Sequence, residues 1–281
     1  MGTERRERQK ANRARKMAEQ HRVEQRDRRK QYAIIGVLIA AGIAGAVYLL
    51  SLGGDDDTAA GSTTSIELNT TTTAEPVEVA EAAVVAPEPG GTIEGTAECP
   101  AADGSSERIT SFTESPPTCI DTTATYTAEI DTTLGVMTVE LDAAKAPETV
   151  NNFVFLARYH YYDGTPFHRI IPGFVIQGGD AVGDPLGTGD PGYAIDEEPP
   201  ELGEYTVGSL AMAKGQGPTT TGSQFFIVTG PQGEALPPEY SLFGSVTNGL
   251  DVALDIEQIP TTPLDQPTEE IYINSITISE S

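Results

Sequence analysis

Apolar and polar positions alternate along the C-terminal half of the chain in short runs that predict β-strands. Tyr126–Ile130 and Val136–Leu141 are two such runs, and the turn-forming residues 131–135 between them indicate a hairpin. In the run Ile271–Ile278 the alternation slips once, between residues 273 and 276, which predicts a β-bulge. Further strands are expected at Phe167–Ile171, Phe174–Gln177, Gly208–Ala213, Gln224–Val228 and Ser241–Val246.

Two segments of the same region follow the helical period instead. Apolar residues recur at positions 150, 153, 154 and 157, and Pro147 with Glu148 before them suits the first turn of a helix. A second helix is expected at Leu250–Ile256. Evenly spaced strands with two helices predict a mainly β domain, an antiparallel barrel or sandwich, over residues 124–281.

The N-terminal part of the chain has a different pattern. Ala33–Leu52 contains twenty residues without a charge, which is the length that a helix needs to cross a bilayer. Residues 1–32 before it carry twelve Lys or Arg and five Asp or Glu, and Asp55–Asp57 follow it. The positive-inside rule predicts a single-pass cell-membrane protein, with residues 33–52 in the lipid bilayer, a basic cytoplasmic tail and an extracytoplasmic C-terminal domain. A cleaved signal peptide is the alternative, although its apolar region is usually shorter.

Composition and charge distinguish further parts of the chain. Residues 53–97 are rich in Thr, Ala, Glu and Pro, and such a segment buries too little apolar surface to fold, so a disordered linker is expected. The net charge of the chain is −25, and residues 33–281 hold five basic and thirty-seven acidic side chains. Nucleic-acid binding by the C-terminal part is therefore excluded, because it would repel phosphates. A monomer is the default expectation.

The chain has two cysteines, Cys99 and Cys119, and we expect them to form a disulfide. Such a bond would close a loop of about twenty residues, contribute on the order of 3 kcal/mol and pin an extension, residues 98–123, to the domain. A metal site is the poor alternative, because two thiols do not complete a zinc site and the chain has three histidines. Neither a metal nor a cofactor is expected.

Three segments carry the candidate chemistry. They are Phe167–Asp180 (FHRIIPGFVIQGGD), Leu210–Ala213 followed by Gly222–Ile227 (GSQFFI), and Leu236–Gly244. In this order and spacing they closely resemble the cyclophilin family of peptidyl-prolyl cis–trans isomerases. The resemblance covers about residues 124–279 and suggests a bacterial membrane-anchored form. It implies an eight-stranded antiparallel barrel capped by two α-helices, and an enzyme that rotates X–Pro bonds in exported or cell-surface proteins and so assists their folding.

The resemblance assigns Arg169, Phe174 and Gln177 to catalysis. The barrier to X–Pro rotation is on the order of 20 kcal/mol and comes from amide resonance. Twisting returns a lone pair to the proline nitrogen, and a fixed guanidinium such as that of Arg169 can stabilise it. Without the motif, a surface ion pair would be the ordinary interpretation of Arg169, and core packing that of the apolar residues. Substrate contacts are implied for His168, Val175, Ala213, Lys214, Gln224, Phe226, Leu236 and Tyr240.

Some positions depart from the family's pattern. Val175 stands where the family commonly has Met, Ala235 where it often has Trp, and Tyr240 where it has His. The loop Lys214–Pro218 is one residue longer than usual. These differences imply a shifted peptide preference and weak binding of cyclosporin, which uses that Trp in the family. They also permit an alternative function, a module that binds proline segments with little turnover; a pure scaffold is a third.

Overall fold

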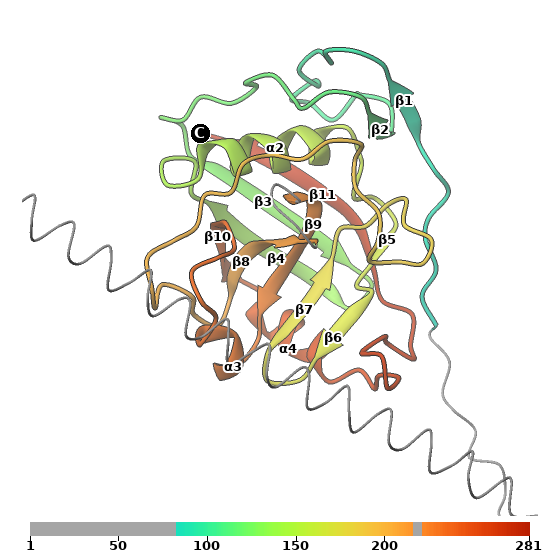
Figure 1. Cartoon of the computed structure of the whole chain (residues 1–281), viewed down its shortest axis with the longest axis vertical. Helices are drawn as coiled ribbons and strands as arrows, with labels where there is room; N and C mark the ends of the chain where they lie inside the picture. The colour runs from blue at the N-terminus through green and yellow to red at the C-terminus, as the bar shows by residue number, and fades with distance from the viewer. Residues whose placement is uncertain (1–82, 216–220) are drawn as a thin grey trace, which may run out of the picture. The chain divides into compact units, whose positions relative to one another are not determined.

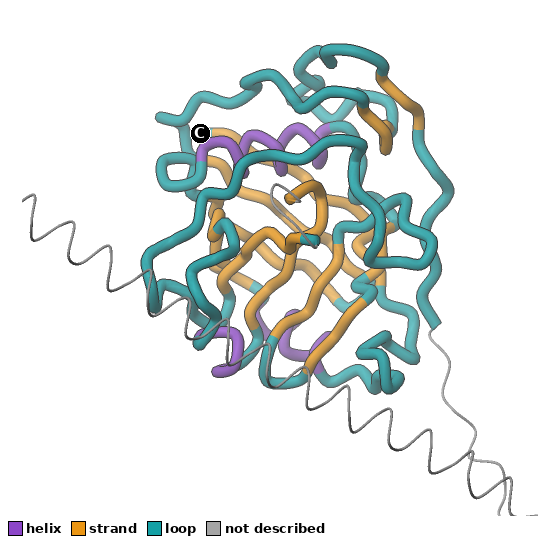
Figure 2. The backbone as a smooth tube through the Cα atoms, viewed as in Figure 1, coloured by secondary structure: helices purple, strands orange, loops and turns teal. Residues whose placement is uncertain are grey.

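The structure, a computed structural model, describes residues 83–215 and 221–281 (Figures 1 and 2). The predicted basic tail (1–32), the predicted transmembrane helix (33–52) and residues 53–82 of the predicted linker lie outside the described residues. Within the described part of the chain, no helix combines the length and the apolar character that crossing a membrane requires.

A hairpin of two seven-residue strands begins the main sheet. β3 (Tyr126–Thr132) pairs antiparallel with β4 (Gly135–Leu141), from Tyr126 opposite Leu141 to Thr132 opposite Gly135. Alternate residues of both strands are buried, as the sequence pattern requires of a sheet with one face on a core. The hairpin predicted around residues 131–135 is confirmed.

The hairpin lies near the middle of a nine-stranded antiparallel sheet that curls around the core (Figure 1). The mainly β prediction is confirmed, whereas the predicted strand number of eight is not, because the two-residue β5 pairs with β11 at one edge. The expected bulge is present as a shift of register between Ile273 and Ser275. The order across the sheet is β5 (Thr165–Pro166), β11 (Tyr272–Glu280), β3, β4, β10 (Leu242–Asn248), β8 (Ser209–Lys214), β9 (Thr221–Val228), β7 (Val175–Gly178) and β6 (Arg169–Ile171).

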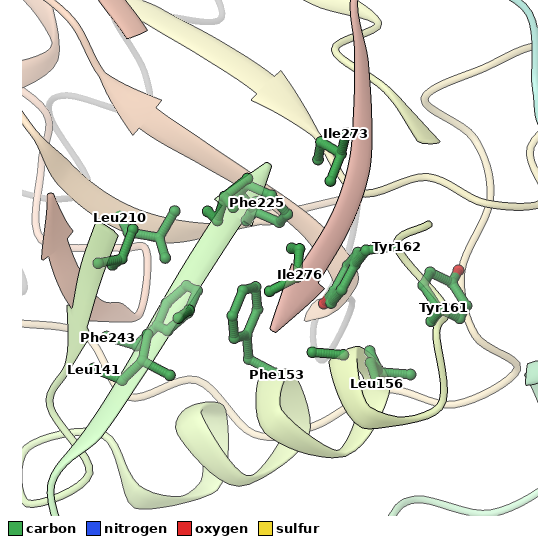
Figure 3. Close-up of a cluster of buried hydrophobic side chains, with 14 of the residues drawn as sticks. Leu141, Phe153, Leu156, Tyr161, Tyr162, Leu210, Phe225, Phe243, Ile273 and Ile276 are labelled. Carbon is green, nitrogen blue, oxygen red and sulfur yellow. The ribbon is translucent and has the colours of Figure 1, made fainter. Parts of the chain in front are cut away.

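The inner face of the curled sheet packs on helix α2 (Pro147–Arg158), close to the helix that the sequence predicts. Phe153 of α2 lies 5.1 Å from Phe243, 5.2 Å from Tyr162 and 5.7 Å from Phe225 between ring centroids (Figure 3). All four rings are fully buried. Tilted and edge-on aromatic contacts of this kind are favourable beyond the area that they bury, so Phe153 joins the helix to β9 and β10.

The opposite side of α2 is covered by the N-terminal part of the described chain. There β1 (Gly91–Ile93) pairs parallel with β2 (Ile109–Phe112). Phe112 packs on Phe155 at 5.1 Å and on Tyr159 at 5.6 Å between ring centroids. Consequently Thr149–Arg158 is buried at every position, although a helix at a protein surface usually keeps one polar face in water.

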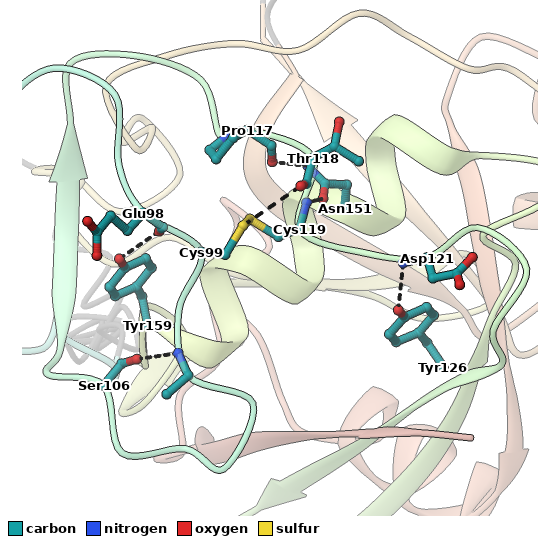
Figure 4. The surroundings of a disulfide bond; sticks show 11 residues. Glu98, Cys99, Ser106, Pro117, Thr118, Cys119, Asp121, Tyr126, Asn151 and Tyr159 are labelled. Carbon is teal, nitrogen blue, oxygen red and sulfur yellow. Dashed lines mark hydrogen bonds between the residues drawn. A yellow bond between two sulfur atoms is a disulfide. The ribbon is translucent and has the colours of Figure 1, made fainter.

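The predicted disulfide between Cys99 and Cys119 is present, with the two Cα atoms 5.4 Å apart (Figure 4). Near it the Asn151 side chain of α2 donates a hydrogen bond to Pro117 O (2.9 Å) and accepts one from Cys119 N (2.7 Å). Tyr159 Oη donates to Glu98 O at 2.9 Å. The covalent link and these bonds hold the segment on both sides of the disulfide against α2.

Several short elements were not expected from the sequence. β1 lies in residues 83–97, which fall within the predicted linker, and Val84 and Ala97 of the same stretch are buried. β5 and helix α3 (Pro231–Glu234) are two and four residues long, too short for a periodic pattern to show. The helix expected at Leu250–Ile256 is α4 (Leu250–Glu257). Of the strand expected at 167–171, only Arg169–Ile171 pairs as β6.

We predict that replacing both cysteines by serine lowers the free energy of unfolding by about 3 kcal/mol, because the loop of the unfolded chain is no longer closed. The activity that the resemblance implies should stay within about twofold of wild type, since the segment that the disulfide closes is bonded to α2 and not to β6–β9. Urea unfolding and an activity assay of the Cys99→Ser/Cys119→Ser variant check both statements. Unchanged stability would show that the disulfide does not hold the extension.

Candidate active site

The turn between β6 and β7 places the central arginine. Ile171, Pro172, Gly173 and Phe174 form a β-turn in which Phe174 N donates to Ile171 O at 3.1 Å. Pro at the second position and Gly173 with φ 75° at the third suit a type II turn. The turn sets Arg169 of β6 directly opposite Gln177 of β7.

A carboxylate of helix α4 is hydrogen-bonded to this turn. The Glu257 carboxylate accepts hydrogen bonds from Gly173 N and from Thr229 Oγ1, the latter at 2.9 Å. Glu257 is 7% exposed, and backbone and hydroxyl donors stabilise a buried carboxylate of this kind. Thr229 N also donates to Phe174 O at 3.0 Å, so the turn is tied to the end of β9 as well.

Strand pairing places further residues beside Arg169 and Gln177 across the sheet. Gln177 of β7 stands opposite Phe226 of β9, and Phe226 stands opposite Ala211 of β8. Directly paired residues point to the same face of a sheet, so these residues and Arg169 form one row on the outer face. The intervening residues, among them Ile176 and Phe225, point inward to the core.

A cavity of ≈ 230 Å³ opens on this outer face. Apolar side chains of Phe174, Val175, Ala213, Phe226 and Leu236 line part of it, and the rings of Phe226 and Tyr240 meet edge to face at 5.5 Å. Its polar side chains are those of Arg169 and Gln177, with Lys214 and the Tyr240 hydroxyl in addition. The residues that line it are Arg169, Phe174, Val175, Gln177, Ala213, Lys214, Phe226, Leu236 and Tyr240, and each of these nine was predicted from the sequence.

The Arg169 guanidinium is contacted on two edges. Its Nη1 donates to Gln177 Oε1 at 3.3 Å, and its Nε lies 3.5 Å from Asp265 Oδ2. The Arg169 side chain is 40% exposed, so the cation is open to a ligand in the cavity. Sequence reasoning missed Asp265, which lies outside every motif and comes near Arg169 only through the fold.

A chain of hydrogen bonds leads away from the arginine. Gln177 Nε2 donates to Gln224 Oε1 at 3.1 Å, and Gln224 Nε2 donates to Gly189 O at 2.9 Å. Gln224 therefore does not line the main cavity, but it is hydrogen-bonded to Gln177, which does. It lines a neighbouring cavity of ≈ 90 Å³ with Gly187, Gly189 and Asp190, among others.

The loop behind Gln224 is organised by a fully buried carboxylate. Asp180 accepts hydrogen bonds from four backbone N–H groups, at 2.6 Å to 3.1 Å. A side chain at Gly183 or Gly189 would overlap that carboxylate, so glycine is required at both. The donors to Asp180 are the N–H groups of Val182, Gly183, Gly187 and Gly189.

Lys214 and Tyr240 form the side of the main cavity opposite Arg169 along the sheet. Lys214 Nζ lies 5.3 Å from the centroid of the Tyr240 ring and 3.2 Å from Glu197 Oε2. Tyr205 Oη donates to Tyr240 O at 2.7 Å and accepts from Tyr240 N at 3.1 Å, which fixes the backbone at this position. The lysine charge is thus balanced by a carboxylate and an aromatic face.

His168 lies in a different environment from the other predicted site residues. It is 5% exposed and does not line either cavity, and its ring occupies the space next to Gly187 that a side chain at that position would enter. Burial lowers the pKa of His168 to about 4, although the nearby charge of Asp180 acts in the opposite direction. The imidazole is therefore neutral near pH 7, beneath the site rather than in it.

Comparison with known proteins agrees with this geometry. The family described as "Cyclophilin type peptidyl-prolyl cis-trans isomerase/CLD" matches residues 127–278. The chain therefore belongs to the cyclophilin-type peptidyl-prolyl cis–trans isomerase family. It is an enzyme of that class, and its substrates are proline-containing peptides.

Particular relatives show the extent of the similarity. The chain is 41% identical over 150 residues to peptidyl-prolyl cis-trans isomerase-like 1 of Gibberella zeae (51% of this chain, 89% of that protein). It is 40% identical over 150 residues to the protein of that name in Homo sapiens (51% and 87%). A crystal structure of a Cryptosporidium parvum cyclophilin-type isomerase in the presence of the dipeptide Ala-Pro is 36% identical, with a TM-score of 0.50 (55% and 99%).

These comparisons correct one prediction. The relatives are peptidyl-prolyl isomerases of eukaryotes, covered over most of their length, and their names describe no membrane-anchored form. The predicted cell-membrane location, with the domain on the extracytoplasmic side, is therefore wrong. That prediction came from an apolar run and its flanking charges, and both lie outside residues 127–278, which carry the family's features.

The depressed pKa of His168 predicts a specific dependence of stability on pH. Between about pH 6.5 and 4 the unfolded chain binds a proton at this residue and the folded chain does not, so stability is lost as pH falls through that window. The residue's contribution to that loss is on the order of 3 kcal/mol. Urea unfolding of wild type and His168→Gln from pH 7 to pH 4 measures it, because other groups cancel in the comparison. The two stability curves should converge as pH falls; parallel curves would rule out a neutral buried His168.

Proposed function

We propose that the enzyme binds the proline ring of its substrate in the 230 Å³ cavity and stabilises the twisted X–Pro amide with the Arg169 guanidinium. The observation that carries this proposal is that the Arg169 cation and the apolar side chains of Phe174, Val175, Phe226 and Leu236 line one cavity, which is large enough for a proline ring. Amide rotation breaks no covalent bond, so a catalyst has to bind the twisted amide more tightly than the planar forms. A positive charge beside the proline nitrogen does this, because the nitrogen regains its lone pair only on twisting.

The apolar walls supply the other half of the proposed mechanism. Phe174, Val175, Phe226 and Leu236 would exclude water from the proline ring, and Tyr240 would close the cavity with its ring. A dry site also strengthens the electrostatic effect of the guanidinium, since water no longer screens it. We assign Gln177 to orienting Arg169 through Nη1 and to contact with the substrate backbone.

The neighbouring positions are assigned to the substrate chain on either side of proline. Ala213 and Lys214 lie at the end of β8, on the rim shared by the two cavities. There, main-chain groups can pair with an extended peptide. Gln224 would contact the residues that precede proline from the smaller cavity. We propose no substrate contact for His168, which lies beneath this surface.

We further propose that one chain is the functional unit and that residues 124–281 are its catalytic domain, with residues 98–123 as an extension. The first proposal is the simplest one, because the mechanism that we propose needs no residue from a second copy of the chain. The second is supported by the disulfide and by the packing of Phe112 on α2, and no residue of 98–123 lines the cavity.

We predict that Arg169→Ala lowers kcat/KM toward an Ala-Pro peptide by about 10²–10³-fold, because the charge on the twisted nitrogen is no longer stabilised. Lys145→Ala is the matched control, since this exposed lysine pairs with Glu204 outside the cavity. A protease-coupled assay of both variants gives the comparison. Activity retained in Arg169→Ala would remove the proposed mechanism, and tight binding without turnover by the wild type would favour a proline-binding module.

Ala235 predicts a second difference that can be measured with an inhibitor. The residue is exposed at the end of α3 and precedes Leu236 of the cavity wall. By resemblance to the family, a Trp here would bind cyclosporin, so the wild type should be weakly inhibited. Ala235→Trp should lower the inhibition constant by about tenfold, through the added aromatic contact. Equal inhibition of both proteins would mean that another part of the cavity excludes the inhibitor.

A further inference from the structure

A carboxylate from a distant part of the chain stands beside the proposed catalytic arginine. Asp265 Oδ2 lies 3.5 Å from Arg169 Nε, and the two side chains are 43% and 40% exposed. The same residue also contacts β6 through its main chain, because Ile170 N donates to Asp265 O at 2.8 Å. Asp265 therefore makes two interactions with β6: a backbone hydrogen bond with Ile170 and an ion pair with Arg169.

The turn that carries Asp265 holds an uncommon backbone conformation. Asp265 has φ 62°, and His160 is the only other non-glycine residue with positive φ in residues 83–215 and 221–281. Asp and Asn tolerate this region better than other side chains, at a small cost in free energy. Such a conformation persists where its surroundings impose it, and it is a reason to look for function.

Thr262 supplies those surroundings. Its carbonyl oxygen accepts from Asp265 N at 3.0 Å, and its N–H donates to Gln266 O at 2.7 Å. Its hydroxyl oxygen accepts from Leu264 N at 3.2 Å. Thr262 is 8% exposed, so the turn is anchored in the protein and presents Asp265 from a fixed base.

Two contacts on two edges define the plane of a guanidinium, whereas one contact leaves it free to rotate. Asp265 faces Nε of Arg169, and Gln177 accepts from Nη1. A guanidinium has five N–H groups in a fixed plane; one on Nη1 donates to Gln177 and the one on Nε faces the Asp265 carboxylate as an ion pair, which leaves three that can face the substrate. The direction in which those three point follows from the two contacts.

We infer that Asp265 is a positioning residue for Arg169, which it holds in the orientation that stabilises the twisted amide. This inference rests on the proposed function of Arg169. A partly exposed ion pair contributes about 0–1 kcal/mol to stability, so the main effect of Asp265 falls on catalysis. Its negative charge also weakens the field of the guanidinium. Orientation outweighs this loss, because small misplacements of a catalytic group cost large factors in rate.

The test uses two replacements that both tolerate positive φ. Asp265→Gly deletes the carboxylate without backbone strain, and Asp265→Asn removes the charge but keeps an oxygen that can accept from Nε. In the full-length protein, Asp265→Gly should lower kcat toward an Ala-Pro peptide about tenfold with KM within about twofold, whereas Asp265→Asn should stay within about threefold of wild type. Glu129→Gln, an exposed acid of β3, controls for lost charge and should change neither constant. A kcat that is unchanged or raised in Asp265→Gly would overturn the inference.

Nitrogen-15 relaxation of the Arg169 Nε–H group tests orientation without reference to activity. In the wild type this group should be rigid, and in Asp265→Gly its order parameter should fall below about 0.6. An order parameter that does not change would overturn the positioning role even if kcat fell. Failure of the proposed function gives a different result, because Arg169→Ala would then keep its activity whatever Asp265 does.

Discussion

The register between β6, β7, β9 and β8 is the constraint on which the site depends. It sets Arg169, Gln177, Phe226 and Ala211 opposite one another in a single row. The two-residue period of a strand then sends this row to the outer cavity and sends Ile176 and Phe225 to the core. A slip of one residue in β7 would exchange the faces and leave Gln177 in the core, away from Arg169. Fold and site are thus specified together, and the core that α2 completes keeps the row in place.

Around this row the structure fixes polar groups in successive layers. Glu257 holds the turn behind Arg169, Asp180 holds the loop behind Gln224, and hydrogen bonds join Gln224 to Gln177 and Gln177 to the guanidinium. Both carboxylates are buried and bound by backbone donors, so they act as rigid supports. The proposed catalysis needs such supports, because a preorganised charge does not have to reorient when the amide twists.

Much of this could be predicted from the sequence, for reasons that differ between residues. All nine cavity residues lie in or next to motifs that resemble those of the family, and it was this resemblance that assigned them to one site. Asp265 could not be predicted, because only the curl of the sheet brings the turn before β11 to β6. His168 was assigned to the substrate by its place beside Arg169, but neighbouring residues of an extended segment point to opposite sides, and its ring is buried. Of the N-terminal segment that packs on α2, the sequence predicted the disulfide that attaches it to the domain. It did not predict β1 and β2, because strands of three and four residues are too short to show a pattern.

The central claim is that Arg169 acts on the twisted amide and not on the bound ground state. Line-shape and exchange NMR of an Ala-Pro peptide on wild type and on Arg169→Ala measure this most directly, because they give the Kd of each isomer and the rate of isomerisation on the enzyme. The account predicts that both Kd values change by less than about threefold while the on-enzyme rate falls by about 10²-fold or more. Weakened binding of both isomers with an unchanged on-enzyme rate would contradict it.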